Sequence, residues 1–445
     1  MTPVISSGDT AWVLISSALV LLMTVGLAFF YGGLVRSKNA LNTMMMSVVA
    51  LGLVGVQWVL LGYSLAFAPG SSWLGGLAWV AFRGVGFEPN AAYAATIPHQ
   101  AHAMFQGMFA IITPALISGA IVERMRFRAY ALFILLWATL VYDPLAHWVW
   151  GQGGWLAAKG ALDFAGGTVV HVSAGVSALV AAWVLGTRRD FRRAPSVPHS
   201  VPLTLLGAGL LWFGWFGFNA GSALAANGVA TLAFVNTNTA AAAALCTWAL
   251  LDLRRSGRAT AVGAATGAVV GLVGITPAAG YVTPAAAIAI GVLCAGVSYT
   301  AIQLRAARGR IDDSLDVFSC HGLAGMAGAL LTGVFATKLA NPAGADGLLA
   351  GHPAQLGVQA LAVAAAAALS GIGTFGILKL VLAIVPTRAG VHEELRGLDL
   401  SEHGEEAYFG EELGVLARPG TGLGDSVVVA HAPEPAEHPL LDAAS

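Results

Sequence analysis

FAGGTVVHVSAG (residues 164–175) and FSCHGLAGMAG (residues 318–328) each contain a single histidine surrounded by small residues. The histidines are His171 and His321, and each follows an aspartate, Asp163 or Asp316, within eight positions. Small residues let helices approach closely, and an ionisable side chain within an apolar segment is a candidate for function. The two stretches therefore predict a shared polar site inside an apolar helical fold.

The composition is that of a membrane protein: 57% of the residues are hydrophobic, 10% are charged, and the mean hydropathy is +0.75. A membrane-spanning helix needs about 20 apolar residues. Runs of this length are centred near Val20, Leu53, Phe109, Leu136, Ala178, Leu210, Ala243, Val269, Ile290, Gly328 and Val363. We expect an all-α polytopic membrane protein with eleven transmembrane helices. The first run lacks a basic leader and cleavage site, which favours a retained helix over a signal peptide.

Basic residues mark alternate loops and predict the orientation, because Lys and Arg accumulate on the cytoplasmic side. They follow the odd-numbered spans: Arg36 and Lys38; Arg124, Arg126 and Arg128; Arg188, Arg189, Arg192 and Arg193; Arg254, Arg255 and Arg258; Arg305, Arg308 and Arg310; and Arg388. The opposite loops hold only Arg83, Lys159 and Lys338. We therefore expect the N-terminus outside and the C-terminus in the cytoplasm of a cell whose inner (plasma) membrane holds the protein.

The spacing of the two histidines predicts an inverted repeat. His171 lies near the start of span five and His321 near the start of span ten, and a displacement by five spans reverses the direction of travel. The expected membrane domain, residues 1–386, then has inverted five-helix halves at about 8–187 and 201–340 and one extra helix at about 357–386. Substrate sites in such proteins lie near the membrane midplane, between the halves.

Two neutral imidazoles that share a hydrogen bond fix each other's tautomer and form a narrow polar line in an apolar tube. The alternative is that each histidine only links neighbouring helices. Cys246, Cys294 and Cys320 offer neither a disulfide framework nor metal-ligand spacing, so we expect no metal and no cofactor. An enzyme that uses His and Asp as metal ligands is a distant alternative, since no third and fourth ligands converge by spacing.

Several motifs give the chain a specific resemblance: GGLVRSKNALN, FQGMFA, GALDFAGGTVVH, WFGFNAGSA, DVFSCHG and GLDLSEHGEEAYF, in this order over residues 8–412. With these motifs the sequence resembles the Amt/Mep/Rh family of ammonium transporters, and its LDFAGG segment is closer to the bacterial-type Amt branch than to the Rh branch. The resemblance implies two inverted halves plus one helix, and a homotrimer with one pore in each subunit. It also implies ammonium as substrate, with methylammonium as a further candidate, and no nucleic-acid partner.

The resemblance assigns roles to matching residues. His171 and His321 are similar to the twin pore histidines, Phe109 and Phe218 to a stacked gate above them, and Trp150 and Ser222 to an outer recruitment site. Asp163 is similar to the acid that supports this site or the deprotonation of ammonium. The implied mechanism recruits ammonium, deprotonates it and passes ammonia, with separate transfer of the proton.

Structural alternatives accompany most of these assignments. Asp163 is equally well placed to cap a helix, and the Ser222 hydroxyl is able to bond to its own helix backbone. Aromatic residues in spans mostly pack or face lipid. Trp155 is a second candidate for the outer aromatic residue. Asp312, Asp313 and Asp316 are expected to stabilise the start of span ten.

Asp143, in span four, stands where the family leads us to expect an uncharged residue. His147, one helical turn further along, is its expected partner.

Residues 387–445 are predicted to form an acidic cytoplasmic tail, since 12 of the 23 acidic residues follow Arg388. The resemblance implies an ordered regulatory segment, with Gly397, Asp399, His403, Gly404, Glu405 and Tyr408 in its motif, and a docking place for a PII-type signalling protein. The alternative is a solvated linker. An ammonium sensor that uses the same pore is the second functional hypothesis.

Overall fold

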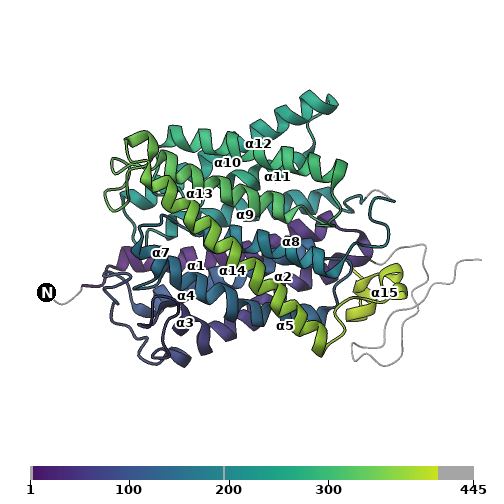
Figure 1. The fold of residues 1–445 in the computed structure, drawn as a ribbon, viewed down its shortest axis with the longest axis horizontal. Coiled ribbons are helices and arrows are strands. Elements are labelled where there is room, and N and C mark those ends of the chain that lie inside the picture. Colours follow the sequence, from purple (N-terminus) through teal and green to yellow (C-terminus); the bar gives the residue numbers. More distant parts are fainter. Residues whose placement is uncertain (1–3, 194–195, 409–445) are drawn as a thin grey trace, which may run out of the picture.

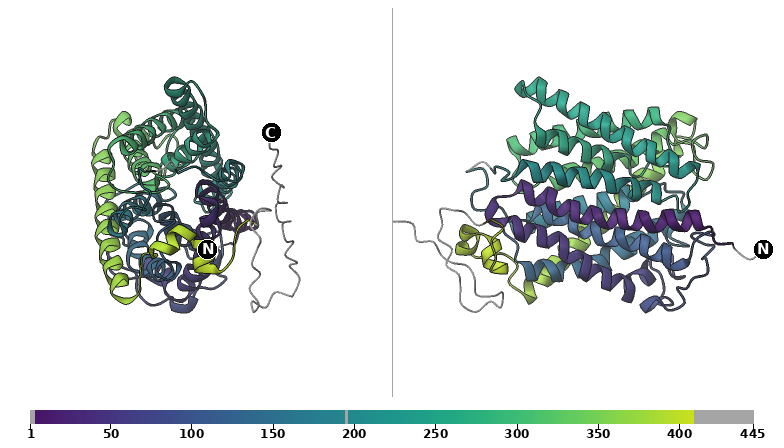
Figure 2. Two further views of the ribbon diagram at one scale, coloured as in Figure 1. Left: turned by 90° about the vertical axis from the view of Figure 1, so that its right-hand side faces the viewer. Right: turned by 180° about the vertical axis from the view of Figure 1, so that it is seen from behind.

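A computed structural model describes residues 4–193 and 196–408, and these residues form a bundle of helices without β-strands. The long helices run side by side, with the N-terminus at one end and α15 at the other (Figure 1). The view from behind in Figure 2 shows the same arrangement. We call the end with α15 the tail end and the opposite end the N-terminal end.

The α-helices are α1 (Ser7–Leu34), α2 (Ala40–Gln57), α3 (Tyr63–Phe67), α4 (His99–Ile117), α5 (Phe127–Trp137), α6 (Asp143–Trp150), α7 (Trp155–Ala158), α8 (Ser173–Leu185), α9 (Val201–Gly221), α10 (Gly228–Ser256), α11 (Ala261–Ile275), α12 (Pro284–Arg308), α13 (Ala324–Phe335), α14 (Ala354–Ile384) and α15 (Val391–Arg396). The π-helical turns are η2 (Trp58–Gly62), η5 (Ala138–Tyr142), η6 (Gly167–Val172), η7 (Phe318–Leu323) and η9 (Asp399–His403). Short 3₁₀ turns are η1 (Ser37–Asn39), η3 (Val80–Phe82), η4 (Ser118–Ala120) and η8 (Leu348–Ala350).

Within the described residues, ten helical segments are long and apolar enough to cross a membrane. They coincide with ten of the predicted centres, and the remaining one, near Val269, falls on α11, an apolar helix of 15 residues. Polar residues start several of these helices by accepting hydrogen bonds from their first turns. These caps are Ser6 for α1, Ser200 for α9, Asn227 for α10, Thr260 for α11 and Thr283 for α12.

The two histidine segments have the same local structure. Each begins with a π-helical turn, η6 or η7, that continues into an α-helix, α8 or α13. The packing is reciprocal, because α8 lies against η7 and α13 lies against η6. The two histidine segments therefore meet in the interior of the bundle.

Backbone contact between these segments occurs at Gly175 and Gly322. A Cβ atom built on Gly175 would overlap the backbone N and Cα of Gly322, which have no side-chain freedom with which to move away. We expect Gly175→Ala to lower the free energy of unfolding by at least about 2 kcal/mol, as overpacking does in tight cores. Denaturant unfolding in detergent measures this.

Gly376→Ala is the matched control for the Gly175 variant, since no atom lies within 4 Å of the position that a methyl group would take on this helical glycine. It should be neutral or slightly stabilising, because alanine is the better helix former. Equal stability of both variants would contradict the backbone contact.

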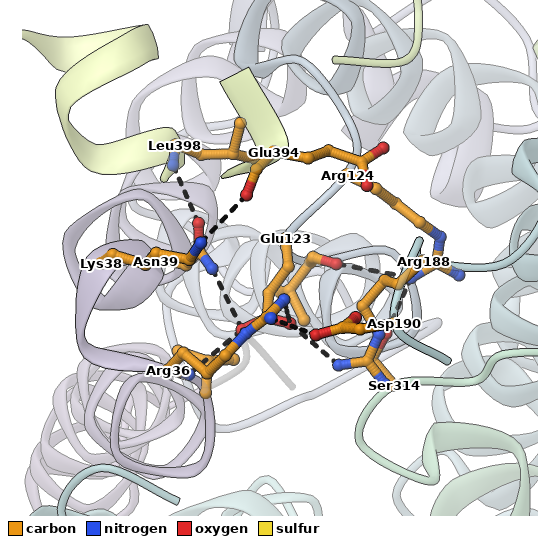
Figure 3. Close-up of polar contacts among 12 residues, drawn as sticks. Arg36, Lys38, Asn39, Glu123, Arg124, Arg188, Asp190, Ser314, Glu394 and Leu398 are labelled. Carbon is orange, nitrogen blue, oxygen red and sulfur yellow. Dashed lines mark hydrogen bonds and ion pairs between the residues drawn. The ribbon is translucent and has the colours of Figure 1, made fainter. Parts of the chain in front are cut away.

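Ion pairs, some of them buried, hold the loops of the tail end together (Figure 3). Glu123, whose side chain is fully buried, pairs with Arg36 at 2.6 Å and with Arg188 at 2.9 Å. Arg188 pairs in turn with Asp312, also at 2.9 Å, and Arg36 pairs with Asp190. We call these five residues the tail-end cluster. It joins the segments that precede α2, follow α4, follow α8 and precede η7.

The tail-end cluster predicts acid sensitivity. Burial alone would raise the pKa of Glu123, but hydrogen bonds from Arg36 and the charges of Arg188 and Arg36 outweigh it and lower this pKa from 4.5 to about 2. A lowered pKa in the folded state stabilises the protein above the unfolded value and loses that contribution as the pH falls through the folded value. We expect stability to decline between pH 4.5 and about 2, by about 3 kcal/mol from Glu123.

Unfolding midpoints measured across this pH range check the prediction, with Glu123→Gln as the comparison. The amide variant should be less stable at neutral pH and should show a flatter decline in acid. An identical pH dependence in both proteins would exclude Glu123 as its source.

The first part of the predicted tail packs against the tail end of the bundle. Asn39 accepts a hydrogen bond from the backbone N of Leu398, and Lys38 Nζ donates to the carbonyl oxygens of Glu394 and Leu395 (Figure 3). The Asp399 carboxylate accepts from two backbone N–H groups at the start of α2. Residues 391–403 are therefore held by many specific contacts, unlike a solvated linker.

The other tail residues of the motif are placed as follows. His403 Nε2 lies 3.0 Å from Asn42 Oδ1, and Tyr408 OH lies 3.1 Å from His199 Nε2. Glu405 is exposed. Gly397 and Gly404 have φ angles of +109° and +71°. Positive φ favours glycine at both positions. Residues 409–445, the rest of the predicted tail, lie outside the described residues.

Candidate functional site

His171 and His321 lie in contact at the centre of the bundle. Their Nδ1 atoms are 3.3 Å apart, and the rings are stacked with centroids 5.4 Å apart. Both side chains are buried, with 1% and 3% of their surface exposed. Because each neutral imidazole has one donor and one acceptor nitrogen, a shared Nδ1–Nδ1 hydrogen bond leaves one outer Nε2 as a donor and the other as an acceptor.

Asp163 determines the position of the first histidine segment. Its carboxylate accepts hydrogen bonds from the backbone N–H groups of Gly166, Gly167, Thr168 and Val169, and from the Thr168 hydroxyl. Gly166 has a φ angle of +110°, which allows the sharp turn before η6. Asp163 therefore caps the segment that carries His171.

The second histidine segment has a similar cap, but a different aspartate provides it. Asp313 accepts from the backbone N–H groups of Val317 and Phe318. Asp316, the acid nearer to His321 in sequence, pairs with Arg305 on α12. With Asp312 paired to Arg188, all three acids stabilise the start of this segment, as predicted.

Aromatic rings continue from the histidines toward the N-terminal end. Phe218 lies 6.0 Å from His171 between ring centroids, Phe109 lies 4.3 Å from Phe218, and Trp150 lies 6.1 Å from Phe109. The Trp150 indole donates to the carbonyl of Asp163 at 2.9 Å. Trp155, the alternative outer aromatic residue, packs instead on Trp73 and Trp148.

Ser222 lies at the end of the helix that carries Phe218. Its hydroxyl donates to the Phe218 carbonyl at 2.8 Å, the backbone bond considered as its alternative role. This bond uses the single donor of the hydroxyl and leaves lone pairs on the oxygen. Ser222 is partly exposed, so this oxygen remains accessible as a hydrogen-bond acceptor.

A narrow pore cavity surrounds the histidine pair. It has a volume of about 10 Å³ and is lined by His171 and His321 together with apolar side chains that include Phe218, Leu27 and Val170. This volume is close to the minimum that holds one water molecule. The cavity at the histidines is therefore too small for a hydrated ion.

Trp215 belongs to the same site, although sequence reasoning did not single it out. Its ring is stacked on His171 with centroids 5.4 Å apart and an interplanar angle of 18°, and its indole donates to the Thr276 hydroxyl. Trp215 opens the WFGFNAGSA motif, three residues before Phe218. Residues three positions apart lie on the same face of a helix, and this spacing from Phe218 was the feature of the sequence that could have indicated Trp215.

The expected partner of Asp143 is wrong. The Asp143 carboxylate is buried and accepts from the Gln57 amide at 2.8 Å, whereas both ring nitrogens of His147 lie within hydrogen-bonding distance of the carbonyl oxygens of Ala66 and Ser71. His147 is drawn to these carbonyls because the loop after α3 folds back over α6. Gln57 and Asp143 lie beside the π-helical turns η2 and η5, whose positions the sequence did not reveal.

Comparison with known proteins gives consistent results. The model of the Ammonium Transporter Family matches residues 11–408. An ammonium transporter of Bacillus subtilis is similar to this chain, with 52% identity over 401 residues that cover 90% of this chain and 98% of the relative. The crystal structure of Saccharomyces cerevisiae Mep2 has a TM-score of 0.81 and 38% identity, covering 87% of this chain and 91% of that chain. A structure described as a Sensor Amt Protein has a TM-score of 0.82 and 29% identity, covering 89% and 98%.

Proposed function

The chain belongs to the Ammonium Transporter Family, a family of membrane transporters and not of enzymes, and we propose that it moves ammonium nitrogen through the histidine-lined pore. The observation that carries this proposal is the contact between His171 and His321 inside a cavity of about 10 Å³. A multi-pass membrane protein with such a lumen transports small molecules that have shed their hydration shell.

Recruitment takes place at the N-terminal end of the pore. The faces of Trp150 and Phe109 attract a cation by about 0.5 to 2 kcal/mol, and the Ser222 oxygen accepts a hydrogen bond from ammonium. An interaction of this size holds the ion briefly and lets it move on. The stacked rings of Phe109 and Phe218, with centroids 4.3 Å apart, then separate the recruitment site from the histidines.

Deprotonation precedes passage. Burial disfavours the charged form of an amine, so ammonium that leaves water gives up a proton and continues as ammonia between His171 and His321. Potassium has no proton to release and is excluded. We propose that the proton crosses separately, with Asp163 and the two imidazoles as its carriers.

The same proposal includes the arrangement in the membrane. The chain has eleven transmembrane helices as an inverted repeat plus one helix, with the N-terminus outside and the tail in the cytoplasm, and three copies form a trimer in the plasma membrane. The reciprocal packing of α8 on η7 and α13 on η6 supports the inverted repeat. Cysteine labelling from either side of intact cells tests the orientation, and light scattering in detergent tests the trimer.

Currents across a supported membrane test the transport proposal. Liposomes that contain the purified protein receive a jump in ammonium and, separately, in potassium. We expect a current with ammonium alone. Internal alkalinisation without current would restrict the proposal to neutral ammonia, and silence in both assays would overturn it.

An ammonium sensor is the second candidate, favoured by the similarity to the structure described as a Sensor Amt Protein. The ordered segment 391–403 at the tail end would transmit the signal, and it is also the proposed docking place for a PII-type protein. A sensor would bind ammonium without turnover, so binding in the absence of flux identifies it. Pull-down with a PII protein, compared between the full chain and a chain ending at residue 390, tests the docking.

A further inference from the structure

A second, larger cavity opens from the pore toward the tail end. It has a volume of about 350 Å³ and shares His321, Phe30 and Val269 with the lining of the pore cavity. A molecule that passes His321 therefore enters a space with room for a cation and several water molecules. We call this space the tail-end cavity.

Two carboxylates line the tail-end cavity, and only one of them is neutralised by a paired base in the described residues. Asp316 pairs with Arg305 at 2.5 Å. Asp252, near the end of α10, has no Lys or Arg nitrogen within 4.0 Å among residues 4–193 and 196–408. Asp252 Oδ2 accepts a hydrogen bond from the Thr260 hydroxyl at 2.7 Å, and the Tyr299 hydroxyl lies beside the same carboxylate.

Two aromatic rings line the same cavity as this carboxylate. Trp248, one helical turn before Asp252, is 5% exposed and lines the cavity. Tyr299 on α12 meets it edge-to-face, with centroids 5.2 Å apart and an interplanar angle of 77°. Indole and phenol faces attract cations, and a carboxylate accepts the N–H donors of ammonium.

A second polar side chain, His321, also lines the cavity. His321 is 3% exposed and lines the cavity, and among the described residues only its Nδ1 atom makes a hydrogen bond, so Nε2 has no protein partner there. Among the described residues, the cavity thus has a carboxylate without a paired base, two aromatic rings and an imidazole nitrogen without a protein partner.

We propose that the tail-end cavity is a second binding site for ammonium, with Asp252 as its charged ligand, and that ammonium bound there slows further transport. The inference rests on the proposed function, since it makes this cavity the exit of the same pore. A cation held at Asp252 occupies part of the cavity into which the next ammonia molecule must pass. Accumulated ammonium therefore limits its own uptake.

Asp252 also has a structural role that the test must separate from binding. Its bond to Thr260 ties the end of α10 to the start of α11, and Thr260 caps α11 through the backbone N of Gly263. Asp252→Asn removes the charge and keeps an oxygen acceptor for Thr260. Thr260→Ala removes the bond and keeps the charge, so the two variants form a matched pair.

Crystals soaked in thallium(I) acetate test binding without any transport. Thallium(I) is a monovalent cation of similar size to ammonium, and its anomalous signal locates it. We expect a peak beside the Asp252 carboxylate in the wild type and in Thr260→Ala, and its loss in Asp252→Asn. No wild-type peak in the cavity, or an undiminished peak in Asp252→Asn, would overturn the site.

Transport from preloaded liposomes tests the consequence. The current after an external ammonium jump is measured against increasing ammonium on the tail side. In Asp252→Asn we expect the tail-side ammonium concentration that halves the current to rise at least about fivefold. This factor corresponds to losing the attraction between unit charges about 4 Å apart in water. The KM for external ammonium should not change. If tail-side ammonium inhibits the current equally in both proteins, this inference is contradicted and the proposed function is not. If no protein carries a current, the proposed function is contradicted, and the thallium experiment alone decides whether the cavity is a binding site.

Discussion

Replacing His171 with alanine is expected to destroy the discrimination between ammonium and potassium. The imidazole occupies much of a lumen that has only about 10 Å³ of free volume. Removing the imidazole makes room for a chain of water molecules, so cations are expected to pass without losing their hydration shells. Desolvating an ion takes several kcal/mol, and each 1.4 kcal/mol is a factor of ten. The ratio of ammonium to potassium current should therefore fall by a factor of about 100 or more.

Paired ammonium and potassium jumps on supported membranes measure this ratio. His352→Ala is the control, because His352 is exposed and lies in the loop before α14, and it should retain the wild-type ratio. If His171→Ala keeps an ammonium-specific current without a potassium current, neither the selectivity nor the proton path depends on this imidazole.

Replacing Asp163 with alanine is expected to cause the largest loss of stability. The change removes the acceptor for four buried backbone N–H groups and one hydroxyl. A buried donor left without a partner costs about 1 to 3 kcal/mol, so the total loss should be at least about 4 kcal/mol. Asp163→Asn keeps one oxygen acceptor and should lose less.

Thermal unfolding in detergent, followed by intrinsic fluorescence, orders these variants. Asp346→Ala is the comparison, since this loop aspartate accepts a hydrogen bond from one backbone N–H group, that of Lys338, and its removal should have a much smaller effect. A wild-type melting temperature for Asp163→Ala would contradict the capping role. An Asp163→Asn protein that is stable but carries no ammonium current would show that the acid also acts in transport.

Hydropathy predicted the helices well because membrane spans need long apolar runs regardless of their packing. Ten predicted centres fall on helices long enough to span, and Val269 falls on the shorter α11. The orientation, the eleven-helix count and the boundary at residue 386 stay predictions. The π-helical turns were not predictable, because a change from i+4 to i+5 hydrogen bonding leaves little trace in composition.

The site was partly predictable for a related reason. A histidine among small residues is conspicuous in an apolar chain, so His171 and His321 were found from the sequence alone. In the sequence, nothing distinguished Trp215 from the other aromatic residues of the spans. Only the structure showed that its ring is stacked on His171. The partner of Asp143 was missed because Gln57 lies 86 residues away in sequence, and local helical spacing suggested His147 instead.

The contact between Gly175 and Gly322 leaves no free space between the backbones of the two histidine segments at the pore. Neither backbone has room to slide past the other without breaking the packing that brings the two imidazoles together. A carrier that exposes its site alternately to each side needs such sliding or rocking. This interface resists both, so we expect the proposed transport to follow a fixed path, with the substrate and not the protein changing its state.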